Sequence, residues 1–481
     1  LMLDRLTTLM PSWRERNPAD LWVALAEAVA FRGDERSYYQ DAVATEAYLG
    51  TARQRFSVRR HTRLLDYPFH DGRNARCWVA FSVDPEADGQ EIKGCDPQTG
   101  LGGTLLLTTV PGLGPTISLE DVQTGLNAGA QPFELLEPIT LYSAHNDIAF
   151  HTWSDEECCL PKGSTTAFLC DDDANRLRLR VGDVLVLEAR ASTTTGERVD
   201  ADRLQRHAVR LTRVDPVAPL VNGVRGVSPA RRDPVTDQPF VAIEWAAADA
   251  LPFALCLSKR IGGVLYTQMA GVSGNIALAD HGLSAPRPDD LKPLPGGRVP
   301  RYLLERTAVA PLTQQGRMRI AGSDAPVLID RHAPASAALK ADLADVRPAI
   351  DVRSEGDRLR WNVQRDLLAS DADAPEFVVE TENDGHALLR FGDGVNGRKP
   401  PAGERLSAAQ RLSAYVRTGN GQVGNVAAEA IGHVQVWFSG IKSVRNPLPA
   451  TGGLDPQPIS EARLYAPQAF RVQERAVTAD D

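Results

Sequence analysis

The sequence of 481 residues has little cysteine and no long apolar run. Six cysteines are too few for a disulfide scaffold and none forms a C-x-x-C pair, so we expect buried, reduced thiols in a protein made in the cytosol. No apolar stretch approaches the roughly 18–20 residues that a membrane helix needs, which excludes a membrane span. The N-terminus lacks the basic flank and apolar run of a signal peptide. It begins with Leu1 instead of Met, which leaves open whether residues precede it.

Basic residues are in the minority. Lys and Arg number 53 against 62 Asp and Glu, which gives a net charge of −9. This balance argues against nucleic acid as a partner, because a general nucleic-acid binder needs a basic face. The hydrophobic fraction of 43% is enough for more than one packed core, and a chain of this length predicts about three domains. Arginine far outnumbers lysine, which is typical of a GC-rich bacterial genome.

Motifs of catalysis are missing as well. The sequence contains no G-x-S-x-G, H-E-x-x-H or phosphate-binding glycine loop. Residues 419–424 match G-x-G-x-x-G, but no sustained helix follows and basic residues stand about 20 positions on, where a dinucleotide site needs an acidic one. His145, His151, Cys158 and Cys159 lack the ligand spacing of a zinc site. We therefore interpret the chain as a protein that is not an enzyme, with no cofactor and no metal.

The first 68 residues have helical periodicity. Residues 17–20 (Asn-Pro-Ala-Asp) predict a helix start with Asp20 as the N-cap. Apolar residues then recur with helical spacing to residue 48, interrupted near Gly33, which indicates either two amphipathic helices or one kinked long helix. A third helix with five arginines follows over residues 53–63. Its basic side is either a solvated face or a contact for an acidic partner.

From Cys77 onward the period changes to two. The predicted strands cover residues 78–83, 104–110, 133–135, 139–142, 177–181, 184–187, 208–212, 241–245, 359–363, 377–380, 388–391 and 411–416. Residues 176–188 read as a hairpin that turns at Gly182 and Asp183. The stretch 283–350 is rich in Pro and Ala and is expected to be a linker or surface excursion. The fold class is multidomain α+β: a helical N-terminal segment followed by mostly antiparallel β domains of sandwich or barrel type.

Three separated parts of the sequence resemble one family, the baseplate J-like wedge proteins of contractile phage tails. The resemblance is strongest to the large "baseplate assembly protein" of extracellular contractile injection systems. It rests on residues 37–41, 46–49, 51–53 and 58–60 in the first part, and on 159–167 with 182–185 in the second. The third and most specific part covers 391–397, 415–421, 424–426, 444–450, 452–453 and 475–478.

The resemblance implies a division of the chain into five parts. These are a core-bundle helical segment at 1–68, a first part of the β core at 69–115, an inserted β-rich wing-type region at 116–345, a second part of the core at 346–450, and a C-terminal segment at 451–481. Family members often continue beyond the last part, so the sequence is expected to be a fragment or a short member. The central region resembles only a subset of the family, and we expect it to contact neighbouring wedges.

The family's function is structural. Its members ring the central hub and spike, connect them to the sheath, and rearrange when the sheath contracts. The implied partners are other copies of the chain or a paralogous wedge subunit, smaller baseplate proteins, and the hub, spike and sheath. The implied location is the bacterial cytoplasm during assembly, and then the baseplate of a phage-tail-like particle that can be released.

Two sets of residues are candidates for these roles. Bundle contacts are expected at Leu21, Trp22, Leu25, Val29, Tyr38 and Tyr39, and the alternative is that these six only form a core within the chain. Structural turns are expected at Gly392, Asp393, Gly394, Gly419, Gly421, Gly424 and Asn425. The glycines would serve positive φ angles or close strand contacts, and Asn425 would cap its turn.

Two other functions remain open. The β domains could form a glycan- or receptor-binding module of a tail particle, although the repetitive shaft of a tail fibre is missing. The chain could also be a tail-associated hydrolase, which would require two carboxylates converging in a cleft.

Overall fold

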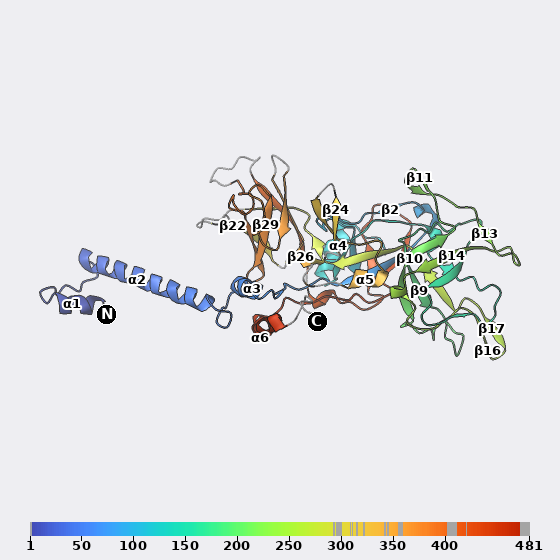
Figure 1. Ribbon diagram of the computed structural model, residues 1–481, viewed down its shortest axis with the longest axis horizontal. Coiled ribbons are helices and arrows are strands. Elements are labelled where there is room, and N and C mark those ends of the chain that lie inside the picture. The colour runs from blue at the N-terminus through green and yellow to red at the C-terminus, as the bar shows by residue number, and fades with distance from the viewer. Residues whose placement is uncertain are drawn as a thin grey trace, which may run out of the picture. The chain divides into compact units, whose positions relative to one another are not determined.

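The computed structural model describes residues 2–291, 294, 301–307, 309, 311–313, 316–320, 323–340, 343, 346–354, 359–401, 411–419 and 421–471. They fall into two compact units (Figure 1). The first contains residues 2–69, 381–383 and 457–471, and the second contains residues 70–380 and 384–456. Asn420 and the segment 475–478, both used in the family resemblance, lie outside the described residues.

The first unit is helical. It contains α1 (Met2–Leu9), α2 (Leu21–Glu46), α3 (Arg55–Arg63) and α6 (Ile459–Tyr465), followed by a 3-10 turn, η7 (Ala466–Arg471). Asp20 is the N-cap of α2, as predicted, and its carboxylate accepts hydrogen bonds from the backbone N–H groups of Trp22 (2.9 Å) and Val23 (3.1 Å). Of the two alternatives, a single helix is found, because α2 continues through Gly33 without interruption.

A six-stranded antiparallel sheet forms the centre of the second unit. Its strand order is β32 (Ile431–Val434), β3 (Leu105–Thr108), β4 (Pro132–Leu135), β19 (Ile276–His281), β1 (Arg76–Val83) and β33 (Ile441–Arg445). One face carries Leu106 and Phe133 into a core that includes Phe81 and Leu135. On β3, Leu105 and Leu107 point to the other face and pack under α4 (Leu119–Asn127). The sheet joins strands that are more than 300 positions apart in the sequence.

The central region forms a closed β-barrel. Its strands are β8 (Thr166–Cys170), β14 (Pro239–Trp245), β10 (Arg206–Asp215), β9 (Val184–Ala189), β18 (Ala270–Ser273) and β6 (Ile148–Ala149), each paired with the next. A bridge between Phe150 and Leu169 then returns the sheet to β8. Alternate side chains such as Leu169 and Ile243 point inward and form one core.

A sheet of eight strands, in which β21 (Asp289–Asp290) pairs with β31 outside the main order, lies in the C-terminal part of this unit. Its order is β20 (Leu283–Ser284), β31 (Leu412–Thr418), β27 (Ile350–Ser354), β28 (Arg360–Gln364), β29 (Glu376–Thr381), β30 (His386–Phe391) and β22 (Arg301–Thr307). β28 and β29 pair in parallel, whereas the pairs β20–β31, β31–β27, β27–β28 and β30–β22 are antiparallel. The core is aromatic: Tyr302, Trp361 and Phe377 all contact Phe391 with ring centroids 5.0–5.4 Å apart.

Short elements complete the second unit. They are η1 (Pro85–Ala87), β2 (Glu91–Ile92), β5 (Ile139–Thr140), η2 (Ser143–His145), β7 (Cys159–Leu160), β11 (Leu220–Val221), β12 (Val224–Arg225), β13 (Arg231–Arg232), η3 (Ala247–Asp249), β15 (Leu255–Cys256), β16 (Lys259–Ile261), β17 (Val264–Tyr266), β21 (Asp289–Asp290), β23 (Pro311–Thr313), β24 (Gly316–Ile320), β25 (Ser323–Val327), α5 (Ala335–Leu339), β26 (Val346–Pro348) and η6 (Gln422–Gly424). The predicted class, multidomain α+β with mostly antiparallel sheets, is confirmed. No described helix is both long and apolar enough to cross a membrane.

The predicted strand at 177–181 is wrong, and so is the predicted hairpin at 176–188. The backbone of this stretch bonds to side chains and to a loop instead of a neighbouring strand. The Leu177 N–H donates to the Asp171 carboxylate (2.8 Å), and the Arg178 N–H donates to Nε2 of His145 (3.0 Å). β9 pairs with β10 and β18. Strands also occupy parts of the stretch 283–350 that was expected to be a linker or surface excursion.

Candidate interaction surfaces

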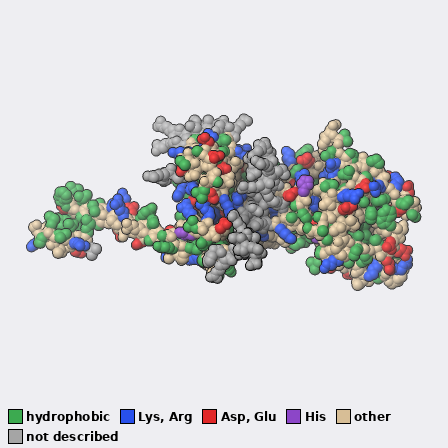
Figure 2. Space-filling view, viewed as in Figure 1, with side chains coloured by type: hydrophobic (Ala, Val, Ile, Leu, Met, Phe, Trp, Pro, Cys, Tyr) green, Lys and Arg blue, Asp and Glu red, His purple; other side chains and the backbone are tan. Residues whose placement is uncertain are grey.

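The long helix α2 exposes its apolar side chains. The six candidate bundle residues, Leu21, Trp22, Leu25, Val29, Tyr38 and Tyr39, are 53–78% exposed. Phe31, Val43 and the nearby Tyr48 are also more than half exposed. Val23 is the one fully buried residue of the helix, and α1 packs against α2. Hydrophobic side chains therefore cover much of α1 and α2 on the face drawn in Figure 2.

The remainder of the first unit is held by a small core that includes a buried arginine. Arg55, in the basic stretch of α3, is 8% exposed; its guanidinium lies 4.2 Å from the Phe69 ring centroid and donates to the Gln457 carbonyl (2.6 Å). Ala52, Val58, Phe69 and Ala462 form the apolar part. Arg55 is therefore not part of a solvated face, because its side chain is used inside the unit.

The turn at residues 419–425 is tightly packed. Gly419 and Gly421 have φ angles of +121° and +87°, and an added Cβ on Gly419 would lie 2.8 Å from the Cα of Gly282. A Cβ on Gly424 would lie 2.6 Å from the His281 ring. Asn425 bridges to Gly453, donating to its carbonyl (2.9 Å) and accepting from its N–H (2.8 Å).

The turn at residues 392–397 is similarly constrained. Gly394 has a φ angle of +90°, and a Cβ on Gly392 would lie 2.1 Å from the backbone of Gly397. The Asp393 carboxylate accepts the N–H groups of Val395 and Asn396, both at 2.9 Å. These hydrogen bonds stabilise the ionised form and lower the pKa of Asp393.

A buried charge network lies next to the 419–425 turn. Arg417 on β31 is fully buried, and its Nη2 lies 3.3 Å from Oδ1 of Asp280 on β19. Asp280 also lies 3.1 Å from Nε of Arg76, and Arg417 Nε lies 3.4 Å from Glu134. All four side chains are at most 3% exposed. This network of two positive and two negative charges joins the six-stranded sheet to the sheet that contains β31.

A second network joins the barrel to the six-stranded sheet. Arg445 on β33 pairs with Glu188 on β9 (2.7 Å) and with Glu429 (3.0 Å). Arg206 on β10 reaches the same Glu429 at 2.6 Å. The relative placement of the modules is therefore set by charges in specific positions as well as by apolar packing.

An interdomain cleft of about 450 Å³ lies between the barrel and the six-stranded sheet. Its lining includes the carboxylates of Glu91, Glu137 and Asp183. Asp183 is held by both Nη atoms of Arg225 (2.5 and 2.7 Å), and Glu137 lies 3.6 Å from Arg331. Burial raises the pKa of Glu137, against the opposing effect of nearby arginines. Two of the three carboxylates are thus committed to ion pairs, and a hydrolase would need a free carboxylate pair.

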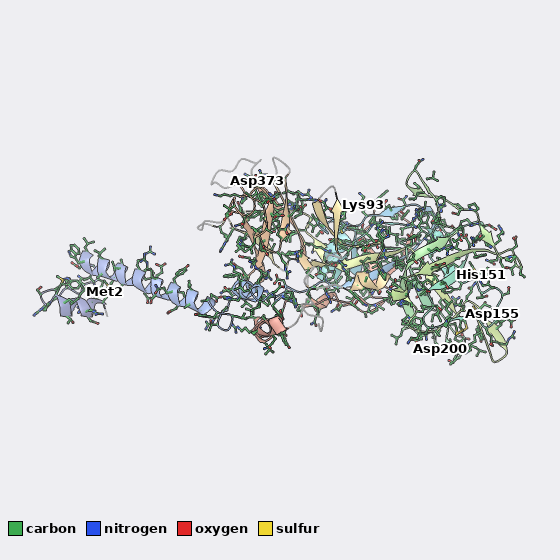
Figure 3. The ribbon with its side chains drawn as sticks, viewed as in Figure 1. Met2, Lys93, His151, Asp155, Asp200 and Asp373 are labelled. Carbon is green, nitrogen blue, oxygen red and sulfur yellow. A yellow bond between two sulfur atoms is a disulfide. The ribbon has the colours of Figure 1, made fainter. Side chains whose placement is uncertain are left out.

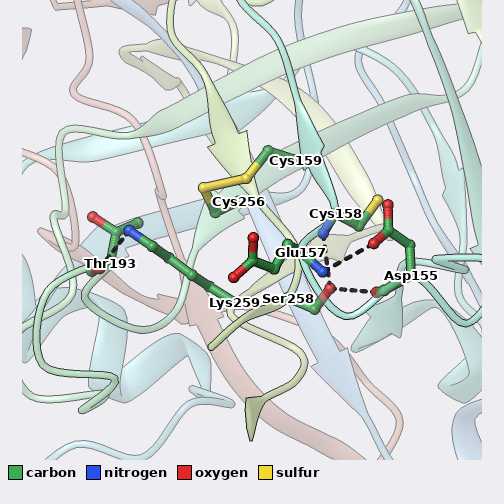
Figure 4. The surroundings of a disulfide bond; sticks show 8 residues. All are labelled: Asp155, Glu157, Cys158, Cys159, Thr193, Cys256, Ser258 and Lys259. Carbon is green, nitrogen blue, oxygen red and sulfur yellow. Dashed lines mark hydrogen bonds between the residues drawn. A yellow bond between two sulfur atoms is a disulfide. The ribbon is translucent and has the colours of Figure 1, made fainter. Parts of the chain in front are cut away.

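The two-stranded sheet of β7 and β15, which packs on the barrel core through Leu255, carries a disulfide, so the expectation of reduced thiols is wrong for two cysteines. Cys159 on β7 bonds to Cys256 on β15, 97 positions away (Figure 4). The antiparallel pairing of β7 with β15 places the two cysteines directly opposite each other. This contact joins parts of the chain that are distant in the sequence. Figure 4 shows Cys158 directed away from the bridge, and burial, with the charge of Asp155, raises the pKa of its thiol. Cys77, Cys95, Cys158 and Cys170 are free.

His145 and His151, whose spacing already argued against a zinc site, have other partners. His145 is buried, and burial lowers its pKa to about 4. Nε2 of His151 lies 3.3 Å from the Asp233 carboxylate. The described residues contain no group of three or more His, Cys, Asp or Glu placed to hold a metal ion. The bridge occupies the sulfur of Cys159.

An aromatic cluster covers the outside of the barrel near His151, which is labelled in Figure 3. Trp153 contacts the rings of His151, Phe168 and Phe240 with centroids 4.6–5.1 Å apart. Trp153 remains 44% exposed and has a φ angle of +55°, which is unusual for a bulky residue. The cluster joins the loop after β6, which contributes His151 and Trp153, to Phe168 on β8 and Phe240 on β14, so periodicity alone does not reveal it.

Comparison with known proteins identifies the N-terminal segment. Residues 1–64 match the sequence model of the family described as "Bacteriophage baseplate protein, N-terminal domain". The match covers α1, α2 and α3. It supports the expected likeness to phage-type baseplate proteins but not the specific baseplate J-like wedge family, and it does not extend to the β modules.

Comparison with solved structures and with curated proteins does not extend the family match beyond the N-terminal segment. The chain resembles a chain in the solved structure entitled "Structure of the type VI secretion system TssK-TssF-TssG baseplate subcomplex revealed by cryo-electron microscopy", with 11% identity and a TM-score of 0.35. The match covers 93% of this chain and 77% of that chain. A TM-score of this size does not establish a shared fold. No match was found among curated proteins.

Proposed function

We propose that this chain is a structural subunit of the baseplate of a contractile, phage-tail-like injection system, and that α2 packs among helices of neighbouring subunits. The observation that carries the proposal is the exposure of apolar and aromatic side chains along α2, within the segment that matches the baseplate family. The length of α2 and the spread of its exposed apolar side chains support this role.

Large apolar side chains that the fold leaves uncovered along a helix usually mark a surface that is buried in an assembly. The 26 residues of α2 extend about 39 Å, and the exposed apolar residues 21, 22, 25, 29, 31, 38, 39 and 43 do not fall on one stripe. Burying the six candidate residues would stabilise an assembly by roughly 9 kcal/mol before the entropic cost of association. Tyr and Trp are among the residues that contribute most at protein interfaces.

The finer role that we propose is that of a wedge. The subunit would contact other copies of itself or a paralogous wedge subunit, and smaller baseplate proteins. It would link the hub and spike to the sheath and rearrange on contraction. The N-terminal family match supports the baseplate part of this role. The β modules are cross-linked by ion networks at Arg417 and Arg445, which suits a part that transmits force as a rigid body.

The test is to place charge on α2 and measure assembly. Leu25→Glu with Val29→Glu puts two carboxylates one helical turn apart on an exposed apolar face. When the chain is co-produced with the products of adjacent genes, this variant should lose its higher assemblies in light scattering and negative-stain microscopy. Gln40→Glu, at an exposed polar position of the same helix, is the matched control and should assemble normally.

The outcomes separate the alternatives. Helical content unchanged by circular dichroism, with assembly lost only in the double variant, supports the proposal. If the double variant assembles as the unmodified chain does, α2 is not the contact and the proposal fails. If the unmodified chain stays a monomer with every neighbour, the baseplate role itself is wrong.

A glycan-binding module is a second candidate, favoured by the exposed Trp153. Aromatic side chains presented at a surface can stack on apolar faces of sugar rings, and Phe168 beside it is 38% exposed. Glycan-array binding that disappears in Trp153→Ala and persists in Trp437→Ala, an exposed tryptophan elsewhere, would support this function. No binding to any glycan by the unmodified chain would exclude it.

A further inference from the structure

The interdomain cleft between the barrel and the six-stranded sheet has the size of a small-molecule site. Its volume of about 450 Å³ lies within the range of pockets that enclose small ligands. Polar and charged side chains form one part of its lining, and apolar side chains form the other. The apolar part comprises Ile139, Leu179, Val181, Val184, Leu185, Leu220 and Ile276. The cleft therefore suits a ligand that has an apolar body and one polar end.

The buried side chain of His145 brings an unused hydrogen-bond donor to this cleft. His145 belongs to the lining and is 4% exposed. Its Nε2 accepts the backbone N–H of Arg178 (3.0 Å), which places the proton of the neutral imidazole on Nδ1. Among the described residues none accepts a hydrogen bond from this Nδ1, and a buried donor without a partner is costly. An acceptor atom of a ligand in the cleft would supply the missing partner.

Two arginines bring guanidinium groups that form no ion pair with a described acidic residue. Arg180 lines the cleft and donates only to a backbone carbonyl. Arg210 lies behind the wall of the cleft, where its Nη1 donates to the Gly182 carbonyl (3.1 Å), and it is 3% exposed. Its Nε and Nη2 have no hydrogen-bond partner in the described part of the chain, although Glu137 and Asp249 attract it from a greater distance. The positive charge of Arg180 is thus left for a ligand.

The carboxylates of the lining are less available than these cationic groups. Asp183 is held by both Nη atoms of Arg225 (2.5 and 2.7 Å), and Glu137 lies 3.6 Å from Arg331. Glu91 is exposed on β2, where water and salt screen its charge. A cation that approached Asp183 would compete with an arginine already in place, whereas an anion at Arg180 would displace no carboxylate. The charges of the cleft therefore favour an anionic ligand.

We infer that this cleft binds a carboxylate that is attached to an apolar group. One carboxylate oxygen would accept the Nδ1–H of His145, and the other would accept N–H groups of Arg180, since the planar guanidinium matches a carboxylate. The apolar lining would cover the remainder of the ligand. Two sources present this chemistry, a free organic acid and the C-terminal carboxylate of another protein chain. The inference does not depend on the proposed baseplate role, because it uses only the second unit.

The test is calorimetric titration of the full chain with matched acids and amides. Hexanoate represents a free acid, and acetyl-alanyl-leucine represents a chain end. At least one of them should bind with a Kd on the order of 100 µM. Its neutral amide should bind at least ~10-fold more weakly, because it lacks the charge-assisted hydrogen bonds.

Variants of Arg180 assign the binding to this cleft. Arg180→Gln should weaken binding of the acid by at least ~10-fold and leave the weak binding of the amide unchanged. Arg213→Gln is the matched control, since Arg213 lies on β10 of the same barrel, 66% exposed beside Glu244, and it should bind like the unmodified chain. Arg180→Lys protects against a folding artefact: it keeps the charge but not the fork, so its affinity should lie between those of the unmodified chain and Arg180→Gln, with an unchanged thermal unfolding curve.

Hydrogen exchange adds an independent readout, because the acid should protect residues 177–185 and should not protect residues 233–238. Binding of hexanoate alone identifies a free acid as the source, and binding of the peptide alone identifies a chain end; either result supports the inference. Three results overturn it: no binding of either acid at concentrations up to about 10 mM, equal binding of an acid and its amide, or unchanged binding in Arg180→Gln.

Discussion

Reducing the Cys159–Cys256 bridge should loosen the β-barrel and leave the six-stranded sheet unaffected. The bridge closes a loop of 97 positions that contains β8, β9, β10 and β14. Chain-entropy arithmetic gives about 4.7 kcal/mol for a loop of this length as an upper value, and native bridges commonly contribute about 2–4 kcal/mol. We expect the free energy of opening the barrel to fall by that smaller amount.

Hydrogen exchange of strand peptides is the suitable assay, because a chain with several modules does not unfold in two states. A loss of about 2–4 kcal/mol corresponds to about 30- to 900-fold faster exchange of the amides that open with the barrel. Peptides from β14 should show this change, whereas peptides from β1 in the six-stranded sheet should not. Thiol titration of the unfolded protein should give four free thiols before reduction and six after it.

Two variants complete the design. Cys159→Ser should exchange like the reduced protein and should not respond to reductant. Cys158→Ser should keep the full response, because Cys158 is free. If β14 exchanges at one rate in the oxidised and reduced proteins while titration shows that the bridge has gone, the reasoning from loop closure is refuted.

Three further predictions concern buried positions of the second unit. Arg417→Met should lower the free energy of opening of β19 and β31, measured by hydrogen exchange, by about 3–5 kcal/mol, because it leaves Asp280 buried with one partner fewer; unchanged exchange of these strands would contradict the network. Gly424→Ala should cost about 1–3 kcal/mol because its Cβ would meet the ring of His281, and a loss below about 0.5 kcal/mol would show that the turn can relax. His145 has a folded pKa of about 4 against an ordinary value near 6.5, so the unfolded chain binds the proton first and stability falls as pH drops through this window. Between pH 7 and pH 5, the free energy of local opening measured by hydrogen exchange should fall by about 2 kcal/mol more in the unmodified chain than in His145→Gln.

Local signals in the sequence predicted the local structure well. The Asn-Pro-Ala-Asp start placed Asp20 at the N-cap of α2, and period-two runs placed β1, β9, β10, β14, β29 and β30 within a few residues. These features depend on neighbouring residues, for which propensity and hydrogen-bond patterns are strong. Gly33 was a misleading signal, since a glycine inside a helix costs only about 1 kcal/mol and the helix continues through it.

Long-range pairing was beyond the sequence. Residues 177–181 alternate like a strand, yet their N–H groups are taken by the nearby carboxylates of Asp171 and Asp183 and by His145, which lies 33 positions before Arg178. The same limit applies to the disulfide, because periodicity does not reveal which strands pair. Closure of the barrel by Phe150 and Leu169 depends on the same kind of contact.

A comparison of α4 with α2 gives the reason for proposing an external partner for α2. In α4 the capping box of Ser118 and Asp121 starts a short helix whose Val122 packs onto β3, so the sequence and the surrounding fold account for it completely. In α2 the cap is also present, but the fold supplies a neighbour for little more than Val23. Large apolar side chains are costly to expose to water, so a contiguous group of them on a surface usually marks a site that a partner covers. Because the uncovered helix lies within the segment that matches the baseplate family, the covering partner is best sought among the subunits of a baseplate.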